Sequence, residues 1–135
     1  MMTTDDLAEN YQDCPFCFDS IRSGIVDELN SMVAIYDKNP VSEGHLLIIP
    51  KRHCLDYFEM TEEEQVDANN LLKTLRIKIA GSDPTVTGFN IGMNSGESAG
   101  QTIFHCHIHL IPRRDGDTEN PRGGVRGVIP GKMNY

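Results

Sequence analysis

Short apolar runs separated by turn-forming residues dominate the pattern along the chain. Residues 31–36 (SMVAIY) form an apolar, β-prone run that ends at a turn in residues 37–40 (DKNP). Residues 45–49 (HLLII) predict a buried strand that stops at Pro50, and residues 87–93 predict a further strand. The pattern therefore indicates a sheet built from short strands.

One longer stretch has the spacing of an amphipathic helix. Thr61 is expected to be its N-cap, and Glu64, three residues later, completes a capping box. Gly81 is expected to end the helix as its C-cap. The apolar positions recur at helical spacing and predict the buried stripe: Val66, Leu71, Leu72, Leu75 and Ile79.

Residues 103–111 predict the last strand, which Pro112 is expected to end. Strands, a long helix and strands again predict an α+β fold with a mainly antiparallel sheet. The chain of 135 residues is 39% apolar, which suits a single domain, residues 1–135, around one core. Residues 1–12 are expected to form a loose polar arm, and residues 115–135 a basic tail rich in glycine and proline.

The charge of the chain argues against several classes of protein. A net charge of −8 is unlike that of a general nucleic-acid or membrane binder, since both need a basic face. No run approaches the roughly 20 apolar residues that span a bilayer, and the acidic N-terminus is unlike a secretory signal, so a cytoplasmic protein is expected. The stretch from Pro121 onward has no acidic residue and contains Arg122, Arg126 and Lys132, so an anion can be received locally.

Three histidines alternate in the last predicted strand. Because alternate side chains of a strand share a face, His105, His107 and His109 are expected to point one way. Their neighbours are expected to point the other way and feed the core: Phe104, Cys106, Ile108 and Leu110. Three imidazoles on one face are costly to bury for structural reasons alone. The alternatives are a hydrogen-bonded core histidine for at least one member, or a metal site built from all three.

Cysteine spacing provides a second candidate site. Cys14 and Cys17 form a CPFC pair that is open to three interpretations: a zinc knuckle, a redox dithiol or a plain turn. The redox interpretation requires a preceding strand, and only polar sequence precedes Cys14, whereas zinc requires two more ligands. Cys54 and Cys106 stand alone and are expected to be buried thiols.

The segment HCHIHLI at residues 105–111 resembles the His-φ-His-φ-His-φ-φ signature of the histidine-triad (HIT) superfamily, in which φ is apolar; cysteine takes the first such position here. Residues 94–102 (NSGESAGQT) are similar to the phosphate loop of that family, and residues 44–53 (GHLLIIPKRH) to its second marker. The matches run from Cys14 to about Arg114. The resemblance implies a HIT fold with about five strands and one long helix, which forms a homodimer through edge-to-edge pairing of two sheets.

The resemblance also implies a reaction. His107 would attack the α-phosphorus of a nucleotide and form a nucleotidyl-histidine intermediate, which water or another acceptor resolves. His109 would bind the phosphate and the leaving group, and His45, from the neighbouring strand, would support the same site.

Substrate-binding residues follow from the same resemblance. Donors for the phosphoryl oxygens would come from the phosphate loop, namely the Asn94 amide, the Thr102 hydroxyl and the backbone N–H groups near Gly100 and Gln101. Composition alone is weak evidence for a phosphate-binding loop, because loops rich in serine and glycine usually only reverse the direction of the chain. Asp37 occupies the position of a ribose-binding residue, with a plain turn aspartate as the alternative.

By the same resemblance, several bacterial HIT proteins carry a zinc ion held by two cysteines and two histidines. The matching positions here are Cys14, Cys17, His53 and His105. Zinc would join the N-terminal segment to the active-site strand and leave His107 free for chemistry. The alternative is a pair of reduced thiols without a metal.

Two segments favour the fragile-histidine-triad branch of dinucleoside polyphosphate hydrolases: residues 40–45 (PVSEGH) and 111–117 (IPRRDGD). The expected activity is hydrolysis or phosphorolysis of a substrate such as diadenosine tetraphosphate. The CxxC pair is more typical of bacterial nucleotide-binding members, so a purine nucleoside phosphoramidase comes second, and Asn94 replaces the glutamine of the fragile branch. A nucleotidyltransferase of the galactose-phosphate type is disfavoured, because it normally has glutamine at the position of His109.

Two non-enzymatic alternatives stay open: a nucleotide-binding regulator with slow turnover, and a zinc-binding interaction module. The basic tail raises a further hypothesis, that Arg122 or Arg126 contacts the distal phosphates of a polyphosphate. A solvated or dimer-contacting tail is the alternative.

Overall fold

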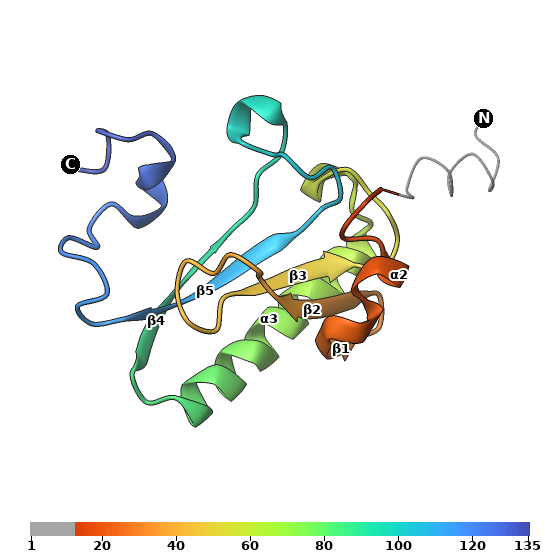
Figure 1. Cartoon of the computed structure of the whole chain (residues 1–135), viewed down its shortest axis with the longest axis horizontal. Helices are drawn as coiled ribbons and strands as arrows, with labels where there is room; N and C mark the ends of the chain where they lie inside the picture. The colour runs from red at the N-terminus through yellow and green to blue at the C-terminus, as the bar shows by residue number, and fades with distance from the viewer. Residues whose placement is uncertain (1–12) are drawn as a thin grey trace.

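The computed structural model describes residues 13–135, so the arm expected for residues 1–12 lies outside the described part. One antiparallel sheet has the spatial order β1-β2-β3-β5-β4. Its strands are β1 (Ile25–Leu29), β2 (Met32–Tyr36), β3 (Leu46–Pro50), β4 (Val86–Gly92) and β5 (Ile108–Arg114). The long helix α3 (Glu62–Ser82) covers one face of the sheet (Figure 1). The predicted α+β class and antiparallel sheet are confirmed.

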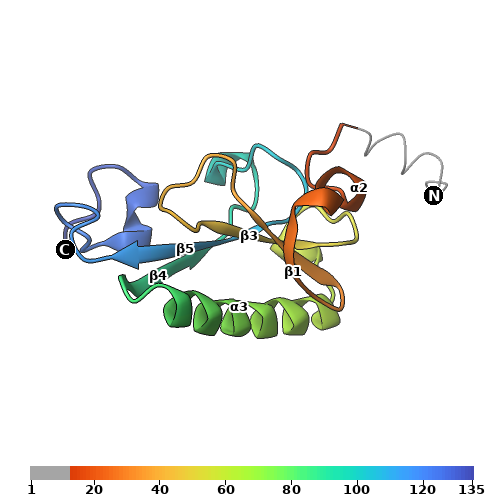
Figure 2. The ribbon, with the colours of Figure 1, turned by 60° about the horizontal axis from the view of Figure 1, so that its bottom comes forward.

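The other face of the sheet carries short helical segments and the C-terminal tail (Figure 2). These segments are α2 (Phe18–Ile21) and the 3₁₀ turns η1 (Arg22–Gly24), η3 (Glu97–Ala99) and η4 (Gly124–Val128). The turn η2 (Tyr57–Glu59) leads into α3, and its Tyr57 packs against the apolar cluster between the sheet and that helix. Among residues 13–135, no helix combines the length and the apolar character needed to cross a bilayer. The edge strands are β1 and β4, and the expected homodimer stays a prediction.

Two apolar clusters lie on opposite faces of the central strands, because successive side chains of a strand alternate between faces. Ala34 and Ile48 pack towards α3, whereas Val33 and Leu47 pack on the other face, near α2. Strands β2 and β3 are therefore buried on both sides, which explains their continuous apolar runs. The strands predicted at residues 31–36 and 45–49 are confirmed to within one residue at each end.

Helix α3 begins as the sequence predicts. The Glu64 N–H donates to Thr61 Oγ1 at 3.0 Å, and the Thr61 N–H donates to Glu64 Oε1 at 2.8 Å, which completes the capping box. The predicted end is wrong: Gly81 lies inside the last turn, and the helix closes at Asp83, whose N–H donates to Ile79 O at 2.9 Å. Because Asp83 Oδ1 also accepts the Thr85 N–H, this side chain ends the helix.

The buried face of α3 also differs from the predicted stripe. Val66 is 56% exposed, so it does not belong to the core, whereas Leu71 and Leu75 are buried as predicted. Asp67 lies on the buried face instead, because its carboxylate accepts hydrogen bonds from the Ser31 hydroxyl at 2.6 Å and the Asn30 amide at 3.2 Å.

Strand β1 is missing from the elements that the apolar pattern predicts. It is an edge strand with the sequence IVDEL, and its exposed positions are Val26 and Glu28. It pairs with β2 across a tight turn in which Asn30 adopts a φ of 51°. A half-exposed edge strand lacks the apolar run that identified β2 and β3.

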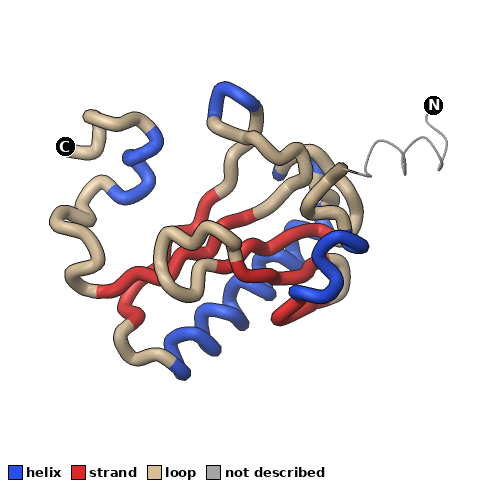
Figure 3. The backbone as a smooth tube through the Cα atoms, viewed as in Figure 1, coloured by secondary structure: helices blue, strands red, loops and turns tan. Residues whose placement is uncertain are grey.

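Strand β5 is shifted towards the C-terminus relative to the prediction. It spans Ile108–Arg114 rather than residues 103–111, and the segment before it is loop (Figure 3). Pro112 lies inside the strand, paired with Phe89 of β4. The β3 ladder ends at Leu110, so β5 has only one partner beyond that point and tolerates a residue without an N–H.

Candidate active site and metal centre

The histidines of the chain lie in two adjoining groups. His53 and His105 face the CPFC pair, whereas His45, His107 and His109 face the side of the sheet away from α3. In β5, His109 pairs with Leu47 of β3 and so shares the face of the α2-side cluster. The local chain path, rather than one regular strand, sets the positions of His105 and His107.

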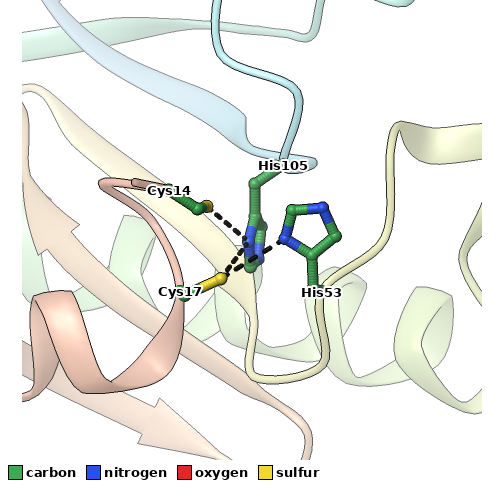
Figure 4. A group of neighbouring side chains, drawn as sticks. All are labelled: Cys14, Cys17, His53 and His105. Atoms are coloured by element: carbon green, nitrogen blue, oxygen red, sulfur yellow. Dashed lines mark hydrogen bonds between the residues drawn. The ribbon is translucent and has the colours of Figure 1, made fainter. Parts of the chain in front are cut away.

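Four side chains from three segments meet beside α2 (Figure 4): Cys14 and Cys17, His53 after β3, and His105 before β5. Cys14 Sγ lies 3.4 Å from His105 Nδ1, Cys17 Sγ lies 3.3 Å from His53 Nδ1, and Cys17 Sγ lies 3.7 Å from His105 Nδ1. In a tetrahedral zinc site, bond lengths of about 2.3 Å to sulfur and 2.0 Å to nitrogen place neighbouring ligand atoms roughly 3.5 Å apart. The four residues therefore fit a zinc ion.

Hydrogen bonds orient these ligands. His105 is fully buried and donates from Nε2 to Pro50 O at 2.9 Å, so its Nδ1 is unprotonated and faces the thiols. Burial lowers the pKa of His105 to about 4, which keeps the ring neutral. Burial and the neighbouring Cys14 thiol raise the pKa of Cys17 to about 12, so a metal must displace this proton on binding. Ser20 Oγ donates to Cys14 O at 2.9 Å and holds the knuckle against α2.

The prediction that three histidines share one strand face is wrong for His105. Its ring points into the cysteine pair, because the backbone from residue 103 to 107 is not part of the sheet. The Cys106 N–H donates instead to Cys54 O at 2.8 Å. Phe104, expected in the core, is 47% exposed, whereas both Cys54 and Cys106 are buried thiols as expected.

His107 is held in one tautomer. Its Nδ1 donates to His105 O at 2.9 Å, and because a carbonyl only accepts, the lone pair of the neutral ring is on Nε2. The ring of Phe16 packs edge-on against His107 with centroids 4.8 Å apart, and the His109 ring lies 5.2 Å away. The contact with Phe16 was not predicted, although this residue stands inside the CPFC motif.

His45 and His109 form a hydrogen-bonded chain. The Val41 N–H donates to His45 Nδ1 at 3.1 Å, so the proton of the neutral His45 ring is on Nε2. That atom lies 2.9 Å from His109 Nδ1 and donates to it, which leaves the His109 proton on Nε2. Burial lowers the pKa of both rings and keeps them neutral.

Asp37 joins this chain, with its Oδ2 at 3.5 Å from His45 Nε2. The three residues have metal-ligating atoms within 4.8 Å of one another, but His45 Nε2 holds a proton and is not available as a ligand. Asp37 Oδ1 also accepts the Asn39 N–H at 2.8 Å, so it is a turn aspartate as well.

Asp37 lines a cleft of about 350 Å³, here called the Phe16 cleft. Most of its wall is apolar and the open rim carries Asp37, Lys38 and Asn39. The apolar lining residues include Phe16, Ile21, Ile35, Leu47 and Ile103. The Phe16 cleft therefore offers an apolar slot with a carboxylate at its edge, next to His107.

The predicted phosphate loop contains η3 and is held from within. The Gly100 N–H donates to Glu97 O at 2.9 Å and the Gln101 N–H donates to Gly96 O at 3.1 Å, so both predicted donors are used inside the loop. The buried Gln101 amide donates to Leu55 O at 2.7 Å, which anchors the loop to the segment after His53.

The structure brings only part of this loop to the histidines. Asn94 lines a second groove together with His109, whereas Thr102 is exposed. Phosphate binding by these residues stays a prediction.

The basic tail contributes to the groove that contains His109, although its arginines are not among the lining residues. Val125 and Val128 of η4 line the groove that contains His109. The guanidinium groups of Arg122 and Arg126 stack on Tyr135 instead, 4.8 Å and 5.2 Å from its ring centre. The hypothesis that either arginine contacts distal phosphates has no support in this arrangement.

Comparison with known proteins places these features in a family context. The HIT domain family matches residues 19–116. An uncharacterized HIT-like protein of Methanocaldococcus jannaschii is 37% identical over 121 residues, which cover 85% of this chain and 91% of that protein. A zinc-bound histidine triad family protein from Mycobacterium smegmatis superposes with a TM-score of 0.71 at 32% identity and covers 81% of each chain. The diadenosine triphosphate hydrolase of Plasmodium falciparum superposes with a TM-score of 0.66 at 28% identity, covering 72% of this chain and 65% of that one.

Proposed function

The chain belongs to the HIT domain family, and from this premise we propose that it hydrolyses nucleoside monophosphate derivatives at the α-phosphorus, with His107 as the nucleophile. The observation that carries the proposal is the hydrogen bond from His107 Nδ1 to His105 O at 2.9 Å. It leaves the lone pair of the ring on Nε2, and the ring packs against Phe16, which also lines the Phe16 cleft.

The Phe16 cleft is the proposed nucleoside site. Its apolar walls suit a base, and Asp37 at the rim suits the hydroxyl groups of a ribose. Because Phe16 contacts both the cleft and the His107 ring, a nucleoside bound there would place its α-phosphate next to Nε2.

The reaction has two steps in this proposal. His107 Nε2 forms a bond to phosphorus as the bond to the leaving group breaks, and the leaving group departs with the electron pair. His109 donates a hydrogen bond from Nε2 to the departing atom or to a phosphoryl oxygen, and His45 keeps that proton on the correct nitrogen. Water then attacks phosphorus and the bond from phosphorus to His107 Nε2 breaks, which releases the nucleoside monophosphate and a proton and restores the neutral His107 ring.

We further propose that Cys14, Cys17, His53 and His105 bind one structural zinc ion. The donor set and its spacing support this, as does the zinc-bound relative from Mycobacterium smegmatis. The metal would join the cysteine knuckle to the segment that carries His107, and its four protein ligands would leave no coordination position for substrate.

The test compares the chain with its His107→Ala variant on diadenosine tetraphosphate and on adenosine phosphoramidate, the two substrate classes that the sequence suggests. Loss of the nucleophile is expected to reduce kcat at least about a thousandfold. His109→Ala, which removes one hydrogen-bond donor, is expected to reduce kcat roughly a hundredfold. Quenching the wild-type reaction in alkaline denaturant should show a nucleotidyl adduct on the chain by mass spectrometry.

Zinc content is the folding control, because His107→Ala leaves all four proposed ligands in place. Turnover that survives this substitution would contradict the proposal. Nucleotide binding without turnover of either substrate would indicate a regulator instead, and the ratio of products with and without added phosphate would separate hydrolysis from phosphorolysis.

A further inference from the structure

The two cysteines outside the proposed zinc cluster, Cys54 and Cys106, are neighbours in the fold although they lie far apart in the sequence. The Cys106 N–H donates to Cys54 O at 2.8 Å, and the two thiols share a hydrogen bond. Backbone segments joined in this way lie about 5 Å apart, and a disulfide joins Cα atoms that are roughly 4.4–6.8 Å apart. These two free thiols therefore have the spacing that a disulfide requires.

The pair combines a buried position with irregular backbone. Each cysteine is 2% exposed and packs in the apolar cluster between the sheet and α3. Neither belongs to a strand or a helix, because Cys54 lies in the loop after β3 and Cys106 in the loop before β5. Loops open at a lower free energy than the strands of the core. A small uncharged oxidant can therefore reach thiols that the fold shields from large reagents.

The position of Cys106 relates the pair to the proposed nucleophile. Cys106 stands between His105 and His107, and His107 Nδ1 donates to His105 O at 2.9 Å. The peptide unit that joins His105 to Cys106 therefore carries the acceptor that orients the His107 ring. A disulfide brings its sulfur atoms to about 2.05 Å, closer than hydrogen-bonded thiols lie, so its formation shifts this peptide unit towards the loop after β3. A shift of about 1 Å at a reacting group can lower the rate roughly a hundredfold.

We propose that hydrogen peroxide converts Cys54 and Cys106 into a reversible disulfide, and that this disulfide switches off turnover at His107. The switch rests on the proposed function, whereas the disulfide does not. In the first step one thiol sulfur attacks an oxygen of peroxide, the O–O bond breaks, and the thiol becomes a sulfenic acid with release of water. The second sulfur then attacks the sulfenic sulfur, and the displaced hydroxide leaves as water with the second thiol proton. Two electrons pass from the thiols to peroxide, and a dithiol reductant restores both thiols by exchange.

Peptide mapping tests the disulfide directly. The full chain as purified is treated with hydrogen peroxide, unfolded in an alkylating reagent that blocks the remaining thiols, and digested with trypsin without reduction. Cleavage after lysine and arginine separates the cysteines into three peptides: residues 1–22 with Cys14 and Cys17, residues 53–73 with Cys54, and residues 79–113 with Cys106. The expected product is a covalent pair of the second and third peptides, which a dithiol separates. A disulfide within the CPFC pair would leave the first peptide unlinked, so mass spectrometry distinguishes the two bonds.

Turnover of adenosine phosphoramidate in the same samples tests the switch. Oxidised wild-type protein is expected to lose at least about tenfold in kcat and to recover it after treatment with a dithiol, because the disulfide moves the acceptor of His107. Cys54→Ala is the matched control, since it keeps the CPFC pair and Cys106 but has no partner for the disulfide. This variant should keep its activity in peroxide. Cys106→Ala gives a second variant with the same expectation, and zinc content serves as the folding control for both.

Three results would overturn the proposal. The first is recovery of the Cys54 and Cys106 peptides in alkylated form after peroxide treatment, which would show that the buried thiols are inert. The second is a bond from either cysteine to the CPFC pair instead. The third is equal inactivation of Cys54→Ala and the wild type, which would assign the effect of peroxide to other groups, such as the proposed zinc ligands.

The two measurements separate this inference from the function on which the switch rests. Equal turnover by the reduced and the disulfide-bonded protein would overturn the switch and keep the hydrolase. No turnover of the phosphoramidate or of diadenosine tetraphosphate by the reduced protein would contradict the proposed function, and the peptide map would still decide whether the disulfide forms.

Discussion

The His105 ring is fully buried and donates from Nε2 to Pro50 O, which assigns its other nitrogen to the cysteine pair. The same logic applies to the catalytic candidates: carbonyl and amide partners determine which nitrogen of His107 and His45 holds the proton. At the scale of the residue, the type of side chain gives the possible chemistry, and one hydrogen bond decides whether a ring is a nucleophile, a donor or a ligand. The sequence identified these residues, but not their tautomers.

Burial of His105 predicts a loss of stability in mild acid for the zinc-free protein. Its pKa is about 4 in the folded chain, against about 6.5 when unfolded. Between about pH 6.5 and pH 5 the unfolded state binds a proton that the folded state does not, so the free energy of unfolding falls as the pH falls, by roughly 2 kcal/mol. Well above pH 6.5 neither state is protonated and this contribution is constant.

Denaturant unfolding of chelator-treated protein at both pH values measures the effect. The window lies above the usual pKa of carboxyl groups, which keeps their titration out of the comparison. His105→Asn, which removes the ring, should show a smaller difference between the two pH values. An unchanged difference in that variant would assign the pH dependence to other groups.

At the scale of the element, helix α3 shows which structural features neighbouring residues alone can predict. The capping box of Thr61 and Glu64 was predictable because both partners lie within one turn. Glu64 has a second role that was not predictable: Arg52 Nη2 donates to its Oε1 at 2.8 Å and connects the helix start to the residue before His53. In β5, by contrast, the alternating pattern extended too far, because the strand begins where β3 supplies a partner.

Removing the N-cap side chain of α3 should lower the stability of the fold measurably. Thr61→Ala deletes the oxygen that accepts the Glu64 N–H and is expected to lower the free energy of unfolding by about 1 kcal/mol. Thr74→Ala makes the same change at an exposed position in the same helix and should stay within about 0.5 kcal/mol of the wild type. Equal losses in the two variants, measured by urea unfolding, would show that the cap contributes nothing.

At the scale of the whole molecule, the cysteine knuckle, the segment after β3 and the segment before β5 meet only in the folded chain. Cys14 and His105 are separated by 91 positions in sequence, yet their ligand atoms lie 3.4 Å apart. A metal at this junction would fix the backbone carbonyl of His105, to which His107 donates. The proposed zinc site and the proposed nucleophile are therefore connected through His105.

Zinc content and thermal stability test this coupling. Purified protein is expected to contain one zinc ion per chain by elemental analysis, and a chelator should lower Tm by more than about 10 °C. Cys14→Ala should lose the metal, whereas Cys54→Ala, a buried thiol outside the cluster, should keep it. Wild-type protein without zinc after purification in zinc-containing buffer, or equal loss of zinc from both variants, would contradict the proposed site.

The sequence by itself determined the chemistry that is present: short apolar strands, a capped helix, and histidines and cysteines in recognisable patterns. These features are local, because strand alternation and helix capping depend on residues a few positions apart. Only the tertiary structure decided that His105 leaves the face of His109 for the cysteines, that Phe16 contacts His107, and that the valines of the tail, rather than its arginines, face His109. Each depends on partners far apart in the chain, which the backbone brings together only when the sheet and its loops have formed.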